Sequence, residues 1–316
     1  MPELKVADRQ WTVAAGDNLL DALNQSGVPV PFSCRAGSCH ACLVQCVSGD
    51  VRDNRPDALT PAQRDQGWRL ACQCQVIEDV QIHTFDPQRD GQAAEVAALD
   101  WLGADVLRLR ITPQRPLRYR AGQHLVLWIG DVARPYSLAS LPEEDRFLEF
   151  HLDCRAPGQF VDAVRQLKAG DPIRLGELRG GALHYDPDWH EKPLWLLASG
   201  TGLGPLFGIL REALRQQHQG AIRLIHVARE AAGHYLDKPL AALAAKHPNL
   251  SVELLTAGEA PGALAQLRLA SRQTQALVCG HPDWVEAFAK RLYLAGLPRN
   301  QLLADVFLTR GNGGVC

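Results

Sequence analysis

The alternation of hydrophobic and polar residues changes character twice along the 316-residue chain. Residues 1–88 hold short alternating segments around two helical stretches, which predicts a small mixed α+β fold. Residues 92–188 hold strand candidates separated by Pro, Gly and Asp turns, which predicts an antiparallel β-barrel. From residue 190 to 316 strands alternate with helices, the pattern of a parallel sheet wound with helices on both faces. The sequence therefore predicts three domains with these boundaries.

Local signals place several elements within this plan. We expect a hairpin over residues 4–13, a helix opened by Asn18 and a second helix opened by Thr60 and Pro61. Residues 85–98 have weak periodicity and are expected to be a linker, and one helix from Phe160 to Gly170 interrupts the barrel. The last recognisable strand of the third domain ends at Gly280.

Composition and charge exclude several classes of protein. With 46% hydrophobic residues, 22% charged residues and a net charge of −2, the chain lacks the basic stripe of a nucleic-acid-binding protein. Its apolar runs are of strand length, too short to span a bilayer. An odd count of nine cysteines with no apolar leader favours a cytoplasmic protein without disulfides. Residues 1–88 carry an acidic excess, either a docking signal for a partner or only a solvated surface. We expect a monomer.

A cysteine-rich loop is the most specific motif of the chain. Cys34, Cys39 and Cys42 form a C-x4-C-x2-C run, and Cys72 follows thirty residues later, at the expected start of a strand. This spacing is typical of the ligand set of a plant-type [2Fe-2S] cluster, and the small residues between the cysteines let backbone amides approach the sulfurs. Zinc is the alternative metal, although its cysteines usually come as two close pairs.

A second group of candidate binding residues lies within the predicted barrel. Arg134, Tyr136 and Ser137 set a guanidinium, an aromatic ring and a hydroxyl within four positions. These groups suit a phosphorylated ring cofactor, and the helix that starts after Gly158 offers free amides for a pyrophosphate. In isolation the same residues are equally compatible with a surface loop before a strand.

Two turns of the third domain fit a dinucleotide. An apolar strand runs into Gly200, Thr201 and Gly202, and Pro205 suits the first turn of the following helix. A glycine-rich turn between strand and helix lets backbone amides approach a pyrophosphate, but alone it is a weak signal. Cys279 and Gly280 end a later strand at the edge where such sheets bind ligands, yet a lone cysteine is more often a buried structural thiol.

Taken in order, these motifs resemble the three-domain reductases of multicomponent oxygenases, which join a plant-type ferredoxin domain to a ferredoxin-NADP reductase unit. Similar chains include the reductases of benzoate and naphthalene dioxygenases, of methane monooxygenase and of CDP-6-deoxy-sugar dehydration. The resemblance covers nearly the whole chain. It implies a β-grasp ferredoxin domain, an FAD-binding barrel and an NAD(P)-binding domain, with a [2Fe-2S] cluster, FAD and NAD(P)H as cofactors.

The resemblance also implies roles for single residues. For the flavin, Arg134 would contact the FAD phosphates, Tyr136 would pack on the ring, Ser137 would lie near its reactive nitrogen, and the amides of Gly158, Gln159 and Phe160 would cap the pyrophosphate. For the nucleotide, the implied site residues are Gly200, Thr201, Gly202, Pro205, Cys279, Gly280 and Phe307. Val161 departs from the Ser or Thr usual in the family, and the chain runs nine residues past Phe307.

The resemblance finally implies an electron path from NAD(P)H through FAD and the cluster to an external acceptor, which would be an oxygenase, a dehydratase or a separate ferredoxin. Arg229 could meet a 2′-phosphate and Glu230 a bare ribose, and we expect NADH to be preferred. Two rival hypotheses are a non-catalytic redox-sensing electron carrier and a zinc-stabilised dehydrogenase without flavin.

Overall fold

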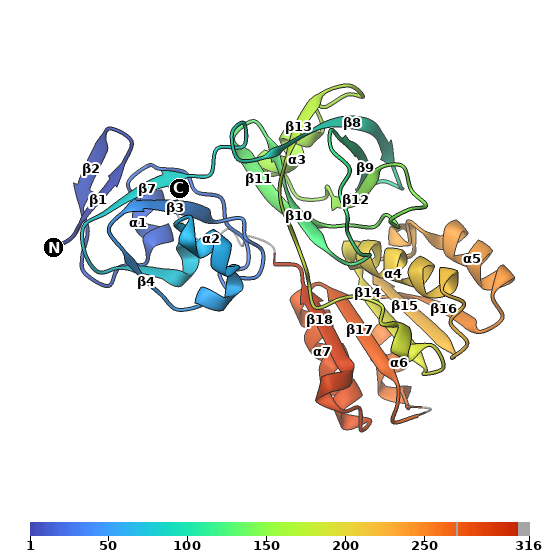
Figure 1. Ribbon diagram of the computed structural model, residues 1–316. Coiled ribbons are helices and arrows are strands. Elements are labelled where there is room, and N and C mark those ends of the chain that lie inside the picture. Colours follow the sequence, from blue (N-terminus) through green and yellow to red (C-terminus); the bar gives the residue numbers. More distant parts are fainter. Residues whose placement is uncertain (270, 309–316) are drawn as a thin grey trace.

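A computed structural model describes residues 1–269 and 271–308, and the chain forms three lobes in sequence order (Figure 1). The three predicted architectures are confirmed: a mixed α+β lobe, a curled antiparallel sheet and a wound parallel sheet. The extension after Leu308, whose role the sequence left open, lies outside the described residues. Among the described residues no helix is long and apolar enough to cross a membrane.

The first lobe, which we call the ferredoxin lobe, contains a mixed sheet in the order β2-β1-β7-β3-β5 and a small β4-β6 ladder. Asn18 caps α1, and Thr60 and Gln63 form a capping box at the start of α2, as their positions before apolar helical stretches predicted. Its elements are β1 (Glu3–Val6), β2 (Arg9–Thr12), α1 (Leu19–Gln25), β3 (Leu43–Ser48), β4 (Val51–Asp53), α2 (Pro61–Asp65), β5 (Trp68–Leu70), β6 (Cys74–Val76) and β7 (Val80–Thr84).

The position of Cys72 differs from the prediction that it starts a strand. It lies in a single 3-10 turn, η2 (Ala71–Gln73), between β5 and β6. The amide of Cys74 bonds to the carbonyl of Ala71 and closes this turn, so β6 begins two residues later than expected. Such a turn interrupts the alternation of a strand and frees Cys72 from the sheet.

The second lobe, the barrel lobe, is a curled antiparallel sheet in the order β11-β10-β13-β8-β9-β12. The amide of Ala139, just after β11, bonds to the carbonyl of Glu149 in β12 and draws the two edges together. Its elements are β8 (Gln92–Trp101), β9 (Val106–Pro113), β10 (His124–Ile129), β11 (Val132–Ser137), β12 (Leu148–Asp153), α3 (Gln159–Val164) and β13 (Pro172–Arg179).

Two predictions for this lobe were wrong in extent. Residues 92–98, expected to be linker, begin β8, because Ala94 and Val96 enter the barrel core while residues 92–95 pair with β13. The expected helix to Gly170 ends at Val164, since the next amides bond carbonyls only three residues back and turn the chain away. The connection between the first two lobes is thus short, over residues 85–91.

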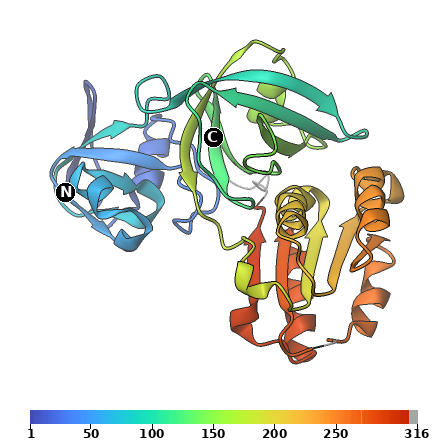
Figure 2. The ribbon, with the colours of Figure 1, turned by 45° about the vertical axis from the view of Figure 1, so that its right-hand side comes forward.

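The third lobe, the nucleotide lobe, is a parallel sheet in the order β16-β15-β14-β17-β18. Helices α4 and α5 cover one face and α6 and α7 the other, because alternate residues of β14 enter two separate cores (Figure 2). Its elements are β14 (Leu194–Ser199), α4 (Leu203–Arg215), β15 (Ile222–Ala228), α5 (Asp237–Lys246), β16 (Leu250–Thr256), α6 (Ala260–Gln266), β17 (Gln275–Gly280), α7 (Pro282–Leu294) and β18 (Leu302–Val306).

The strand β18 extends the sheet beyond the last strand that the sequence predicted. It pairs in parallel with β17, with Asp305 opposite Cys279 and Val306 opposite Gly280. Its five residues are half-buried or exposed, and Asp305 interrupts their apolar run, so the strand lacks the apolar pattern of a core strand. Because β14 and β17 are neighbours while their connections diverge, the switch point of the sheet lies between their carboxyl ends.

Candidate functional site

The cysteine loop brings its four predicted residues together as two sulfur pairs. The Cys39 thiol donates a hydrogen bond to Cys34, and the Cys42 thiol donates one to Cys72. These bonds lower the pKa of Cys34 to about 4 and that of Cys72 to about 7, while the pKa values of Cys39 and Cys42 are raised. Two of the four sulfurs are therefore ready to carry negative charge at neutral pH.

Backbone and side-chain donors surround these sulfurs. The amides of Ala36 and Cys39 donate to the Cys34 sulfur at 3.3 and 3.4 Å, and Gln73 Nε2 lies 3.4 Å from the Cys72 sulfur. Gly37, at φ +76°, lets the loop curl so that its own amide faces Cys72. Donors of this kind stabilise anionic sulfur, so the loop is built for sulfurs in the thiolate form.

The arrangement of the four sulfurs distinguishes a [2Fe-2S] cluster site from a zinc site. Across residues 1–269 and 271–308, no three His, Cys, Asp or Glu side chains surround one point as ligands of a single ion would. The four cysteines instead pair two and two, Cys34 with Cys39 and Cys42 with Cys72. One pair for each of two irons is the arrangement that a [2Fe-2S] cluster requires, whereas tetrahedral zinc needs all four sulfurs around one centre.

The barrel lobe gathers the residues predicted for the flavin around one end of β11. Arg134, Tyr136 and Ser137 lie on β11, which forms an edge of the sheet. The rings of Tyr136 and Phe160 are 5.1 Å apart, which holds the start of α3 beside this strand. Tyr136 thus lies beside the start of α3, whereas the Arg134 guanidinium donates to the carbonyl of Phe32 in the ferredoxin lobe at 3.4 Å. Val161 packs into the barrel core.

The nucleotide lobe places its predicted turn at the switch point of the sheet. Gly200, Thr201 and Gly202 form the 3-10 turn η4 (Gly200–Gly202) between β14 and α4, and Gly200 has a φ of +53°. A Cβ on Gly202 would lie 2.6 Å from the Cα of Gly280, so both glycines are needed where β14 and β17 end. Pro205 is buried in the first turn of α4, as expected.

The remaining predicted residues of this lobe border the same edge. Cys279 ends β17 with 1% of its surface exposed, and burial raises the pKa of its thiol well above the usual value. At neutral pH it is therefore a protonated thiol. The amide of Phe307 donates to the carbonyl of Gly280 at 2.8 Å, which sets Phe307 beside the turn. Arg229 and Glu230 are exposed just after β15.

The three candidate sites converge where the lobes meet. Burial lowers the pKa of His124 on β10 to about 4 and raises that of Asp305 on β18, and Cys34 is near enough to both to make a smaller electrostatic contribution. Gly204 at the start of α4 lies against His151 on β12, where an added Cβ would be 3.2 Å from Nδ1. Accordingly, β18 ends near the junction of the first two lobes (Figure 1).

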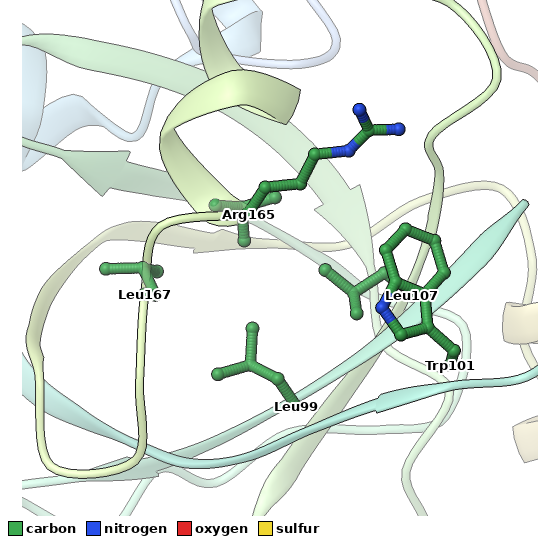
Figure 3. A pocket seen from close by; sticks show the side chains of 6 residues that line it. Leu99, Trp101, Leu107, Arg165 and Leu167 are labelled. Atoms are coloured by element: carbon green, nitrogen blue, oxygen red, sulfur yellow. The ribbon is translucent and has the colours of Figure 1, made fainter.

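A hollow in the barrel lobe lies away from these residues. A cavity of about 450 Å³ opens at the C-terminal end of α3, opposite the end that faces β11. Leu99, Leu107 and Leu167 face it, with Trp101 and Arg165 at one side (Figure 3). None of the predicted site residues lines this cavity.

Comparisons with known proteins agree with this architecture. Residues 4–76 match the model of the 2Fe-2S iron-sulfur cluster binding domain, and residues 196–290 match that of the oxidoreductase NAD-binding domain. The reductase component of the naphthalene 1,2-dioxygenase and salicylate 5-hydroxylase systems of a Ralstonia species is 32% identical, over 94% of this chain and 95% of the relative. The chain belongs to the family of ferredoxin–NAD(P)+ reductase components of oxygenase systems.

Two further similarities show the breadth of this reductase family. The crystal structure of a cytochrome P450 reductase from Amycolatopsis superposes with a TM-score of 0.67 at 27% identity, covering 98% of this chain and all of that one. A CDP-6-deoxy-L-threo-D-glycero-4-hexulose-3-dehydrase reductase from Yersinia pestis is 25% identical over 94% of this chain and 95% of the relative. The predicted assignment as an NAD(P)-dependent oxidoreductase with a [2Fe-2S] domain is thus confirmed.

Several residues beside the cysteine loop were not identified from the sequence. His40 is buried and His124 half-buried beside the cysteine loop, and Glu177 and Arg179 reach it from β13. Their only signal in the sequence was alternation: Glu177 and Arg179 are two residues apart in a strand and so share a face. Which surface that face would meet depends on how the lobes pack.

Proposed function

We propose that this reductase passes electrons from NADH through FAD to a [2Fe-2S] cluster and then to an oxygenase component. The observation that carries the proposal is the convergence of the cysteine loop, the β11 group and the switch-point turn at one junction. Cys39 and Ala41 of the loop pack in one buried cluster with Val126 and Trp128 on β10 and Ala133 on β11, and Gly204 after the switch-point turn lies against His151 of the barrel lobe. Electrons would therefore cross short distances between three adjacent sites.

The ferredoxin lobe would hold the cluster through Cys34, Cys39, Cys42 and Cys72. The sulfur pairs and the amides that face them supply the ligand set and its hydrogen bonds. Zinc is disfavoured because the sulfurs form two pairs. A colourless, iron-free purified protein would contradict this assignment.

The barrel lobe would hold FAD. Arg134 would bind the phosphates, Tyr136 would cover the ring with Ser137 at its reactive edge, and the first amides of α3 from Gly158 to Phe160 would face the pyrophosphate. The 5.1 Å distance between the rings of Tyr136 and Phe160 supports a site that joins β11 to the start of α3. Flavin supplies the chemistry that links a two-electron hydride donor to a one-electron acceptor.

The nucleotide lobe would hold the dinucleotide across Gly200, Thr201, Gly202 and Pro205. Cys279, Gly280 and Phe307 would border the nicotinamide. The thiol of Cys279 would act by filling space, because burial keeps it protonated. We favour NADH because Glu230, exposed beside Arg229, can bind the ribose hydroxyls. A kcat/KM higher for NADPH than for NADH would overturn this preference.

The acceptor is proposed by family analogy to be an oxygenase component, with the protein acting as a monomer. A sugar dehydratase is the second candidate acceptor, because one relative is the reductase of a CDP-6-deoxy-sugar dehydrase. Adding purified candidate acceptors to the NADH-reduced enzyme under anaerobic conditions distinguishes the two, since only the true acceptor is reduced at a catalytic rate.

A substitution in the cysteine loop tests the proposed order. In Cys39→Ser, NADH-dependent reduction of ferricyanide, which can take electrons from the flavin, should persist, while reduction of cytochrome c through the cluster should be lost. Equal loss of both activities would contradict the order. Retention of both would show that the cluster lies outside the path.

A further inference from the structure

The ferredoxin lobe is held against the barrel lobe by a polar group that comes from one strand. Glu177 and Arg179 lie two residues apart on β13 and share a face of it. The Arg179 guanidinium donates to the carbonyl oxygen of Ala58 at 2.6 Å and to His40 Nε2 at 2.8 Å, both in the ferredoxin lobe. Glu177 also accepts a hydrogen bond from Gln63 at the start of α2.

His40 is fixed between these two side chains. Arginine has no acceptor, so His40 Nε2 must accept the bond from Arg179, and the ring proton sits on Nδ1. Nδ1 lies 3.3 Å from Glu177 Oε2, and Glu177 Oε1 in turn pairs with Arg179 at 3.1 Å. Only 4% of the His40 side chain is exposed, although φ is +55° at this residue. His40 lies between Cys39 and Cys42, so the contact acts directly on the cysteine loop.

An apolar contact completes the same interface. Val126 and Trp128 on β10 and Ala133 on β11 form one buried cluster with Cys39 and Ala41 of the loop. The ring of Phe85, at the start of the connection between the lobes, stacks on Trp128 with centroids 5.3 Å apart. The loop is thus seated on the outer face of the strands whose other face forms the barrel core.

Arg179 and Ser137, one of the residues proposed to bind the flavin, lie in one row across the sheet. His124 on β10 is directly opposite Arg179 on one side and Ser137 on the other. Burial and the neighbouring His40 lower the pKa of His124 to about 4, so it stays neutral between them. A rigid row across three strands therefore connects the residue that holds the cysteine loop with the end of β11.

We propose that Arg179, supported by Glu177, is a positioning residue that locks the ferredoxin lobe onto the barrel lobe and keeps the cysteine loop beside Ser137. This inference rests on the proposed function and adds how the distance between the two centres is maintained. Contacts outside the connection are needed because residues 85–91 form no helix or strand that would fix the two lobes relative to each other. Without Arg179, two hydrogen bonds to the ferredoxin lobe are lost. Glu177 also loses its ion pair with Arg179 and no longer has a cation beside His40.

The test compares the holoenzyme with its Arg179→Gln variant, using Arg108→Gln as the matched control. Arg108 is a partly buried arginine of the same lobe that pairs with Asp100 on the neighbouring strand. Each variant loses one tryptic site and one ion pair. Trypsin cleavage after Arg89, whose side chain is 55% exposed in the connection, reports how often the lobes separate.

We expect Arg179→Gln to accelerate cleavage after Arg89 by at least about tenfold, the factor for losing one charge-assisted hydrogen bond. Cytochrome c reduction should fall about tenfold because the centres are misplaced, while ferricyanide reduction should stay near the wild-type rate. Arg108→Gln should change neither the cleavage nor the ratio of activities. The mass of the 1–89 fragment identifies the cut.

Unchanged cleavage and an unchanged ratio of activities in Arg179→Gln would overturn the proposal. So would an equal loss of both activities, because Arg179 would then support the barrel itself. The proteolysis does not depend on electron transfer. If the wild-type enzyme failed to oxidise NADH, the proposed function would fall while cleavage after Arg89 would still decide whether Arg179 locks the lobes.

Discussion

A Cβ atom on Gly202 would lie 2.3 Å from the carbonyl oxygen of Cys279, so the turn after β14 rests directly on the end of β17. Real Cβ atoms do not approach an oxygen this closely. The contact crosses the switch point of the parallel sheet, where two neighbouring strands send their chains to opposite faces. It fixes the path of the turn proposed to bind the dinucleotide.

Gly202→Ala tests this contact. The added methyl group must push the turn away from β17, so we expect a loss of stability of about 1–3 kcal/mol and a rise of about tenfold in the KM for NADH. Gly262→Ala is the control, because a Cβ at Gly262 in α6 meets nothing within 4 Å. Steady-state kinetics and urea unfolding measure both effects. A KM for NADH equal to that of the wild type in Gly202→Ala would show that the turn does not belong to the nucleotide site.

Arg134→Gln tests the proposed flavin site. Loss of a charged donor to a phosphate weakens binding by about 1.5–3 kcal/mol, which raises the Kd of FAD by about tenfold or more. The measurement is the ratio of flavin to protein after gel filtration, followed by titration with FAD. Arg108→Gln again serves as the control. Full flavin content and wild-type affinity in Arg134→Gln would place the phosphates elsewhere.

His226, which lies on β15, should make the stability of the protein depend on pH. Its Nε2 donates to the Gly200 carbonyl at 3.0 Å, and burial together with His234 lowers its pKa to about 4. The unfolded chain takes up this proton near pH 6.5, so the folded state loses stability as pH falls from about 6.5 to 4. At pH 5 the loss from this residue is about 2 kcal/mol.

His226→Gln keeps an amide donor and removes the titration. Urea unfolding at pH 7.5 and pH 5 should show a smaller loss of stability in the variant than in the wild type. The comparison isolates His226 and its contact with His234 from the other histidines, which contribute equally to both proteins. Identical losses would mean that His226 is not buried as a neutral side chain.

Local patterns predicted what depends on local chemistry. The caps at Asn18 and Thr60, the apolar strands of the nucleotide lobe and the C-x4-C-x2-C loop all carry signals within a few residues. Elements whose pattern is weak were misjudged. The alanine-rich start of β8 resembled a linker, and Asp305 interrupted β18, although both are stabilised by pairing with distant strands.

Contacts between the lobes were beyond local patterns. Nothing near Arg179 in the sequence indicates that it donates to Ala58, 121 residues earlier. The same holds for the stacking of Phe85 on Trp128. The candidate residues of each cofactor could be named from the sequence, but their convergence follows only from how three separately folded units pack.

Rapid mixing of the oxidised enzyme with NADH in the absence of oxygen tests the electron path most directly. Absorbance changes of the flavin and of the cluster are followed separately, in the wild type and in Cys39→Ser. We predict that the flavin is reduced first and the cluster afterwards, and that Cys39→Ser shows flavin reduction alone at an unchanged rate. Cluster reduction that precedes flavin reduction, or a flavin that NADH cannot reduce in Cys39→Ser, would contradict this prediction.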